Sequence, residues 1–122
     1  RLYATPEIEA RVSALLQRRL QGEPVAYLVG EWEFFGLPLI VNEHVLIPRS
    51  DTEVLAQQAI DYLKDYPGAR VLDLCTGSGC VGLAIASRLA DCRVVLADCA
   101  SRAPMRGSTI CRAVLQCCRR TL

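Results

Sequence analysis

The chain has few aromatic residues and no long apolar run. Aromatic side chains make up 6% of its 122 residues, while hydrophobic residues make up 52%. This hydrophobic share supports one globular core, and the length supports one domain or one domain plus a fragment. No segment approaches the roughly 18 consecutive apolar residues of a membrane-spanning helix. We therefore expect no membrane partner.

The start of the chain carries no targeting signal. Residues 1–6 contain neither a methionine nor the apolar core of a secretory signal peptide. We therefore expect a soluble, cytoplasmic protein whose start is cut from something longer.

Histidine is almost absent, and the cysteines lack the spacing of a metal site. The single histidine, His44, falls in a predicted turn, and none of the seven cysteines forms a CxxC pair. Zinc sites need such clustered ligands, so no metal is predicted. A disulfide framework needs an oxidising compartment, and no export signal indicates one. We expect reduced thiols.

Acidic residues are missing from the end of the chain. Residues 99–122 contain five arginines, four of the seven cysteines and no Asp or Glu, although the net charge of the whole chain is only +1. This tail also lacks aromatic residues, so it does not indicate a direct nucleic-acid interface. Residues 110–115 allow at most a short helix, and no strand is predicted after them. We interpret the tail as unstructured or non-native.

Two helices and an intervening β region are predicted in the first half. Apolar residues recur at helical spacing over residues 6–20, after a Thr-Pro pair that favours a helix start. Residues 25–47 are rich in bulky and β-branched side chains punctuated by Gly and Pro, which predicts one or two short hairpins. A second helix is predicted to about residue 65, where Ser50 caps the start and Glu53 reaches back in a capping box.

Residues 70–98 have the pattern of a strand, a glycine-rich turn, a helix and a second strand. The strands are predicted at 70–74 and 93–98, and the helix at 79–90. A crossover of this kind makes the two strands parallel neighbours. The pattern therefore predicts an α/β fold.

The turn between these strands has features of a nucleotide-type site. Gly77 and Gly79 have no Cβ, so a ligand can approach the backbone closely. Asp98 ends the next strand 21 residues after Gly77, an offset at which a carboxylate can meet ribose hydroxyls. Asp73 lies inside the first strand, where a carboxylate needs a partner. That partner is either a donor of the glycine turn or a cationic or amino group of a ligand.

Two cofactor classes fit the turn. Residues 77–82 match the GxGxxG pattern of dinucleotide-binding proteins, which is a weak signal by itself. That fingerprint usually opens a domain, whereas here it comes late in the chain. The carboxylate of Asp73 suits the amino group and positive sulfur of S-adenosylmethionine. The residues therefore favour S-adenosylmethionine over a nicotinamide nucleotide.

Four motifs, in this order and spacing, resemble the HemK/PrmC methyltransferases, which modify peptide chain release factors in bacteria. They lie at residues 22–30, 33–37, 45–53 and 71–79. The Cys-Thr-Gly-Ser-Gly form of the last motif departs from the commoner Gly-Thr-Gly form. A sister group that methylates a ribosomal-protein glutamine also uses the Cys form. The Gly-Glu-Pro and Asp-Thr-Glu motifs look more like the release-factor group.

The resemblance implies a domain organisation. The fold is a Rossmann-like, S-adenosylmethionine-dependent methyltransferase fold, incomplete here and preceded by a helix and a β-hairpin linker. Residues 1–24 are the end of a helical substrate-recognition domain, and residues 25–50 are the linker. Residues 51–98 start the methyltransferase domain, and residues 99–122 are the atypical tail.

The resemblance also implies a reaction and a cofactor site. The reaction transfers a methyl group from S-adenosylmethionine to the side-chain amide of the glutamine in the Gly-Gly-Gln motif of a release factor. Arg49 and Thr52 are implied to lie near the cofactor at the mouth of the site. The remaining candidate cofactor-binding residues are Asp73, Cys75, Thr76, Gly77, Ser78, Gly79 and Asp98.

The chain lacks the segment with which the family holds the acceptor amide. That segment is Asn-Pro-Pro-Tyr, and the single asparagine here is Asn42, far upstream. No catalytic residue is assigned, and we expect impaired activity. The composition of residues 99–122 is typical of an out-of-frame reading, so we hypothesise a frameshifted or truncated gene product. The alternatives are a ribosomal-protein glutamine methyltransferase, a nicotinamide-nucleotide-binding module and a non-catalytic remnant.

Overall fold

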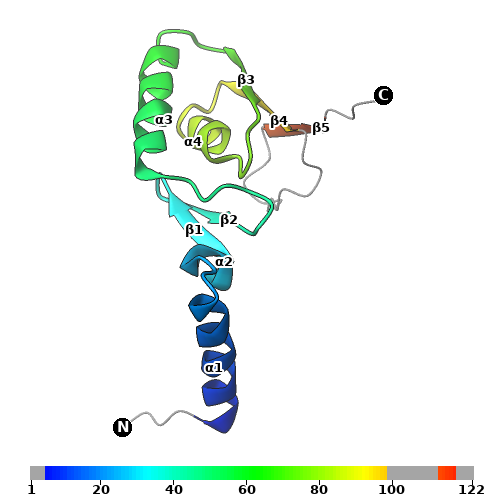
Figure 1. Cartoon of the computed structure of the whole chain (residues 1–122). Helices are drawn as coiled ribbons and strands as arrows, with labels where there is room; N and C mark the ends of the chain where they lie inside the picture. Colours follow the sequence, from blue (N-terminus) through cyan, green and yellow to red (C-terminus); the bar gives the residue numbers. More distant parts are fainter. Residues whose placement is uncertain (1–4, 99–112, 118–122) are drawn as a thin grey trace, which may run out of the picture.

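A computed structural model describes residues 5–98 and 113–117. Figure 1 shows α1 extending away from a body in which helices α3 and α4 pack beside a sheet. The elements in chain order are α1 Pro6–Leu20, α2 Val25–Val29, β1 Glu31–Phe34, β2 Leu37–Ile40, α3 Ser50–Leu63, β3 Arg70–Leu74, α4 Cys80–Arg88, β4 Arg93–Asp98 and β5 Ala113–Cys117.

Helix α1 begins and ends where the sequence predicts. The hydroxyl of Thr5 accepts the backbone N–H of Ile8 at 3.4 Å, which caps the first turn. Gly22 has a φ of 94° and donates its N–H to the carbonyl of Arg19 at 3.0 Å, a left-handed ending that glycine favours. No residue of α1 is buried, so its apolar side chains stay outside the core.

The segment predicted as hairpins contains a helix followed by one hairpin. Residues 25–29 form α2, which corrects the expectation of strands there, and Ala26 of α2 packs against Val41 and Val45. Strands β1 and β2 are antiparallel and are joined by a two-residue turn of Phe35 and Gly36. Both turn residues have positive φ, 55° and 76°, as a type I′ turn requires.

Helix α3 is confirmed, but its predicted capping box is wrong. Ser50 is already the first helical residue, and Arg49 takes the capping position without a side-chain hydrogen bond. The carboxylate of Glu53 does not reach back to Ser50. Its Oε1 accepts the backbone N–H of Phe35 at 2.9 Å, so it ties the hairpin turn to the helix.

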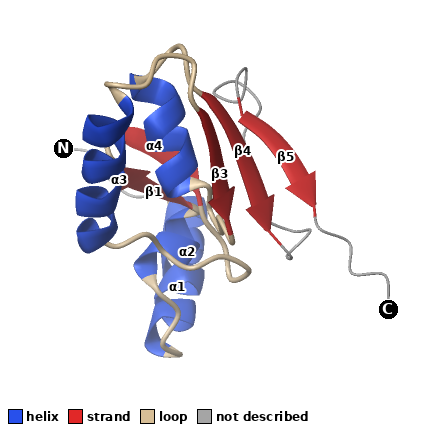
Figure 2. Cartoon of the chain, turned by 90° about the horizontal axis from the view of Figure 1, so that it is seen from above, coloured by secondary structure: helices blue, strands red, loops and turns tan. Residues whose placement is uncertain are grey.

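The main sheet has the strand order β3-β4-β5, and all its described pairs are parallel. The parallel pairing of β3 and β4 confirms the prediction for residues 70–98. Residues 113–117 pair with β4 as a third strand, so the expected short helix over 110–115 is wrong for the part that the structure describes. Figure 2 shows α3 and α4 on the same side of this sheet.

The core lies between these two helices and the sheet. Ala56 and Ile60 of α3 pack with Ala84 and Ile85 of α4 and with Leu96 of β4, and all five are buried. Phe34 and Leu39 extend the core into the hairpin. The described residues therefore form an α/β fold, as predicted. Among the described helices, none combines the length and apolar character that a bilayer crossing needs.

Candidate functional site

The turn between β3 and α4 has an unusual backbone. Cys75, Gly77 and Gly79 all have positive φ, at 59°, 56° and 80°. A Cβ built on Gly77 would meet nothing within 4 Å, so the backbone there faces open space. A Cβ on Gly79 would lie 3.2 Å from Cδ1 of Leu83, so the glycine also permits close packing under the turn. The turn presents bare backbone outward, which suits a ligand that lies against it.

Asp73 links this turn to the first turn of α4. Its Oδ2 accepts the hydroxyl of Thr76 at 2.6 Å and the backbone N–H of Gly82 at 2.9 Å. The sequence left two kinds of partner for Asp73, a donor of the glycine turn or a group of a ligand. In the described structure, donors of the chain itself bind this carboxylate. The same Gly82 lies so close to the sheet that a Cβ on it would be 2.1 Å from Cδ2 of Leu96.

Asp98 holds the middle of the turn. Its Oδ2 accepts the backbone N–H of Gly77 at 2.6 Å, and the two residues are 21 positions apart in the sequence. The backbone N–H of Thr76 also donates to the carbonyl of Ala97 at 3.1 Å. The carboxyl ends of β3 and β4 therefore meet at the glycine turn.

The remaining residues of the turn differ in exposure. Thr76 and Ser78 are buried, and Cys75 is exposed. Cys80 begins α4 and is buried; this burial raises the pKa of its thiol, and a hydrogen bond with Ser78 opposes the effect. Cys75 is thus the exposed thiol at the turn.

Arg49 lies in a cavity of about 720 Å³ that no residue of the glycine turn lines. The loop that carries it, residues 41–49, runs beneath the carboxyl end of the sheet in Figure 2. Thr52 does not line the cavity, and it donates its N–H to the carbonyl of Arg49 at 3.0 Å. Within the described residues, no hydrogen bond joins Arg49 or Thr52 to the turn. The cavity is lined by Pro24, Tyr27, Trp32, Glu33, Phe34, Leu46, Ile47, Pro48, Arg49, Ser50, Asp51 and Glu53.

The structure thus separates the predicted residues into two groups. At the carboxyl end of the sheet, one hydrogen bond joins Asp73 to Thr76 and another joins Asp98 to Gly77. Arg49 belongs to the cavity between the hairpin and the start of α3. Clusters that could hold a metal ion are absent from the described residues.

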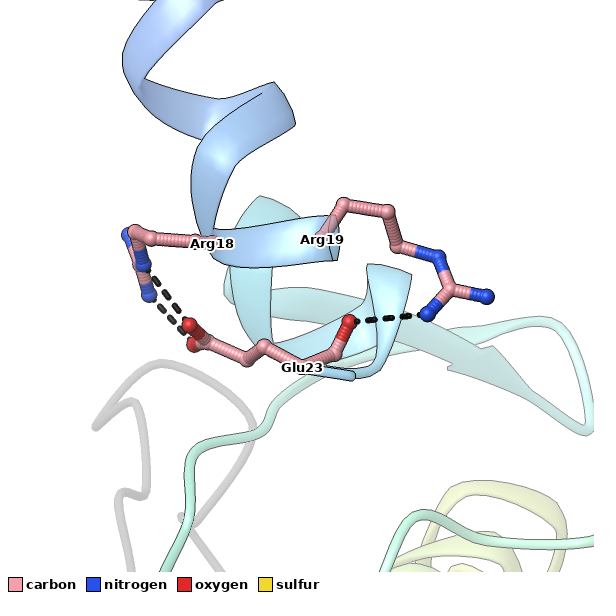
Figure 3. Close-up of polar contacts among 3 residues, drawn as sticks. All are labelled: Arg18, Arg19 and Glu23. Carbon is pink, nitrogen blue, oxygen red and sulfur yellow. Dashed lines mark hydrogen bonds and ion pairs between the residues drawn. The ribbon is translucent and has the colours of Figure 1, made fainter. Parts of the chain in front are cut away.

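Sequence reasoning missed the ion pair at the end of α1. Arg18 binds both carboxylate oxygens of Glu23, with Nε 2.8 Å from Oε2, and Arg19 reaches the carbonyl of Glu23 at 3.5 Å (Figure 3). Glu23 follows Gly22, whose backbone is in the left-handed region. Its contacts with the two arginines therefore hold the connection between α1 and α2 in one conformation. The five-residue spacing of Arg18 and Glu23 is no standard helix pair, so only the predicted helix end at Gly22 hints at it.

Two family profiles match this chain, one at its first helices and one from α3 onward. The family profile described as PrmC N-terminal domain matches residues 2–30, and one described as lysine methyltransferase matches residues 50–113. A release factor glutamine methyltransferase of Buchnera aphidicola subsp. Baizongia pistaciae is 48% identical over 88 residues, which are 72% of this chain and 32% of that protein.

Two further relatives carry the same name. The release factor glutamine methyltransferase of Escherichia coli K12 is 48% identical over 94 residues, 77% of this chain and 34% of its own length. That of Shewanella oneidensis is 49% identical over 103 residues, 80% of this chain and 36% of its own length. The chain therefore spans about a third of the curated relatives that it matches. The profile over residues 50–113 shows a methyltransferase domain. Because the PrmC N-terminal profile matches the first helices and several release factor glutamine methyltransferases are about 48% identical over most of the chain, the chain belongs to the HemK/PrmC family of methyltransferases.

Proposed function

We propose that the chain binds S-adenosylmethionine at the glycine turn, as part of an enzyme that methylates a glutamine side chain of a peptide chain release factor. The single observation that carries the proposal is the hydrogen bond between Gly77 and Asp98, because it places a carboxylate beside open glycine backbone at the end of two parallel strands. In open α/β sheets, ligands bind at the carboxyl ends of the strands. The relatives named as release factor glutamine methyltransferases supply the reaction.

The residues of the turn fit an adenosine-containing cofactor. Asp98 would hold the ribose hydroxyls, while Cys75, Gly77 and Gly79 would lie against the cofactor. Thr76 and Ser78 are buried, so they would support the turn from beneath. When bound, S-adenosylmethionine supplies an electrophilic methyl group on a positive sulfur. Arg49 and Thr52 are proposed for the mouth of the site, one on each side of the start of α3.

The acceptor side of the reaction needs an orienting element. The lone pair of an amide nitrogen is delocalised into its carbonyl, so the amide must be held by both its N–H and its C=O and aligned with the methyl group. The Asn-Pro-Pro-Tyr segment expected for this task does not occur in the 122 residues. We therefore propose that this chain by itself transfers methyl groups poorly or not at all.

The domain roles follow from the same proposal. Residues 1–24 end a helical part that recognises the protein substrate, residues 25–50 link it to the catalytic part, and residues 51–98 start the incomplete Rossmann-like domain. Residues 99–122 are proposed to be read out of frame. The nucleotide sequence tests this last point: an alternative frame after codon 98 should encode further strands and Asn-Pro-Pro-Tyr, and its absence would contradict the idea. The proposed partner implies a cytoplasmic location.

Calorimetry tests the cofactor class. The chain is titrated with S-adenosylhomocysteine and, separately, with NAD. We expect saturable binding of the first and none of the second. Binding of NAD alone would replace the proposal with a nicotinamide-nucleotide-binding module, and binding of neither would leave a non-catalytic remnant.

A methyl-transfer assay tests which protein accepts the methyl group. A full-length relative serves as the enzyme. Three substrates are compared: a release factor, the large-subunit ribosomal protein that the sister group modifies, and a lysine peptide. The last is included because one matched profile is described as lysine methyltransferase. We expect transfer to the release factor alone, and transfer to either of the others reassigns the substrate.

A further inference from the structure

The outer edge of β1 is open. Strand β1 pairs with β2 alone among the described strands. Phe34 and Leu37 flank the two-residue turn, so they form a hydrogen-bonded pair, and the alternation leaves Glu33 in a non-hydrogen-bonded pair. The backbone N–H and C=O of Glu33 therefore point away from β2. Within the described part of the chain, neither group has a hydrogen-bond partner.

The outer edge of β2 is blocked in contrast. The residue opposite Glu33 is Pro38, which has no backbone N–H. Prolines at such outward positions prevent a sheet edge from pairing with another strand. One edge of the hairpin is thus closed to a further strand, and the other is left available.

A cavity runs along the open edge. The cavity of about 720 Å³ is lined by Trp32, Glu33 and Phe34 of β1, and no residue of β2 lines it. A second wall comes from the start of α3 and the residues just before it, namely Pro48, Arg49, Ser50, Asp51 and Glu53. The hydrogen bond from the Phe35 amide to Glu53 fixes these two walls relative to each other. The space therefore lies where an added strand would pair with β1.

The charges around the cavity favour a basic ligand. Glu33 and Asp51 line it, and among the described lining residues Arg49 alone is cationic. Glu53 also lines it, but its Oε1 already accepts the Phe35 amide. Tyr27 and Trp32 add aromatic faces, which attract cations.

We propose that an extended peptide segment bearing a basic side chain binds in this cavity as an additional strand on β1. Its backbone pairs with Glu33, and its basic side chain lies near Asp51 and Trp32. Strand addition of this kind takes affinity from main-chain hydrogen bonds and specificity from side-chain pockets. The inference rests on the proposed function in one respect: the peptide segment is assigned to the protein substrate.

Fluorescence of Trp32 tests the proposal, since it is the single tryptophan of the chain and lines the cavity. The blocked pentapeptide acetyl-Thr-Arg-Thr-Gln-Thr-amide is titrated into the 122-residue chain without cofactor. We expect a saturable change in emission. The variant Glu33→Pro removes the outward N–H but keeps the pairing with β2, as Pro38 does on the other strand. We expect it to bind at least about tenfold more weakly, because one or two hydrogen bonds are lost and the ring obstructs the edge.

Matched controls separate edge pairing from charge. Glu33→Ala keeps the N–H, so it should lose less affinity than Glu33→Pro, and its loss should shrink at high salt. Replacing arginine by glutamate in the peptide should weaken binding to the unmodified protein. A peptide N-methylated on its backbone tests the pairing even if Glu33→Pro does not fold, which circular dichroism reports.

Three results overturn the proposal. They are no saturable change in emission, equal affinity of Glu33→Pro and the unmodified chain, and equal affinity of the N-methylated peptide. A dimer that Glu33→Pro dissociates would also overturn it, because the edge would then belong to a second copy. Calorimetry with S-adenosylhomocysteine reports on the glycine turn independently, so failure here and failure of the proposed function are distinguishable.

Discussion

The backbone N–H of Gly77 donates to Oδ2 of Asp98 at 2.6 Å, across 21 positions of sequence. Asp73 meanwhile joins Thr76 to Gly82 through one carboxylate oxygen. The two carboxylates therefore hold the turn at different places: Asp98 binds its middle, and Asp73 connects it to the first turn of α4. A turn that is already ordered loses less conformational freedom when a ligand binds.

Removing the Asp98 carboxylate should weaken cofactor binding. We expect Asp98→Ala to bind S-adenosylhomocysteine about 1–3 kcal/mol less tightly, the cost of losing a hydrogen bond to a charged group. Calorimetry measures the difference. Asp91→Ala is the matched control, because Asp91 is exposed and precedes β4. Equal dissociation constants for Asp98→Ala and the unmodified chain would remove Asp98 from the site.

The elements that the sequence predicted well are those with local signals. Helix α1 has a capping threonine and a glycine end, and both are used as expected. Strands β3 and β4 are apolar runs on either side of a glycine turn, so their positions and their parallel pairing could be predicted together. The same pattern predicts that Asp98 ends its strand near the glycine turn, because parallel strands end at one edge, but it does not predict the hydrogen bond from Gly77.

The elements that were missed depend on partners distant in sequence. Glu53 has the spacing of a capping box, but the amide of Phe35, 18 residues away, takes its carboxylate. Strand β5 forms by pairing with β4, which no local pattern in an arginine- and cysteine-rich segment indicates. The surroundings of Arg49 depend on how the hairpin packs against the start of α3. This contact between distant segments leaves no local pattern in the sequence, so it could not be predicted.

Gly82 should not tolerate a side chain. A Cβ there would lie 2.1 Å from Cδ2 of Leu96 and 3.0 Å from Oδ2 of Asp73. We expect Gly82→Ala to destabilise the fold by about 1–3 kcal/mol, the usual cost of overpacking. Urea unfolding followed by circular dichroism measures it. Ser87→Ala on the exposed part of α4 is the control, and equal midpoints for both variants would contradict the close packing.

Among Cys75, Cys80 and Cys92, the cysteines whose side chains the structure describes, Cys75 should be the most reactive. It is exposed, whereas Cys80 and Cys92 are buried. Burial also raises the pKa of Cys80, which lowers its thiolate fraction at neutral pH. We expect iodoacetamide to modify Cys75 at least about tenfold faster than the other two, since thiolate and access set the rate. Peptide-resolved mass spectrometry measures this.

Cofactor binding should protect the same thiol. If the glycine turn holds the cofactor, saturating S-adenosylhomocysteine should slow the alkylation of Cys75 and leave the slow rates of Cys80 and Cys92 unchanged. NAD at the same concentration is the control. An alkylation rate of Cys75 that S-adenosylhomocysteine does not change would separate this residue from the cofactor site.

The ion pair at the end of α1 should make its local structure sensitive to acid. The hydrogen bonds from Arg18 hold the pKa of Glu23 below its ordinary value of 4.5. A carboxyl group with a lowered folded pKa stabilises the structure fully above its ordinary pKa, and the contribution is lost as the pH falls through the folded pKa. We therefore expect Arg18→Ala to raise the pKa of Glu23 toward 4.5 in a carboxyl NMR titration. The two proteins should differ in thermal stability at pH 7 and converge in strong acid. Arg11→Ala, on the same helix but outside the pair, should leave the titration of Glu23 unchanged. If Arg18→Ala also leaves it unchanged, the clamp between α1 and α2 does not form in solution.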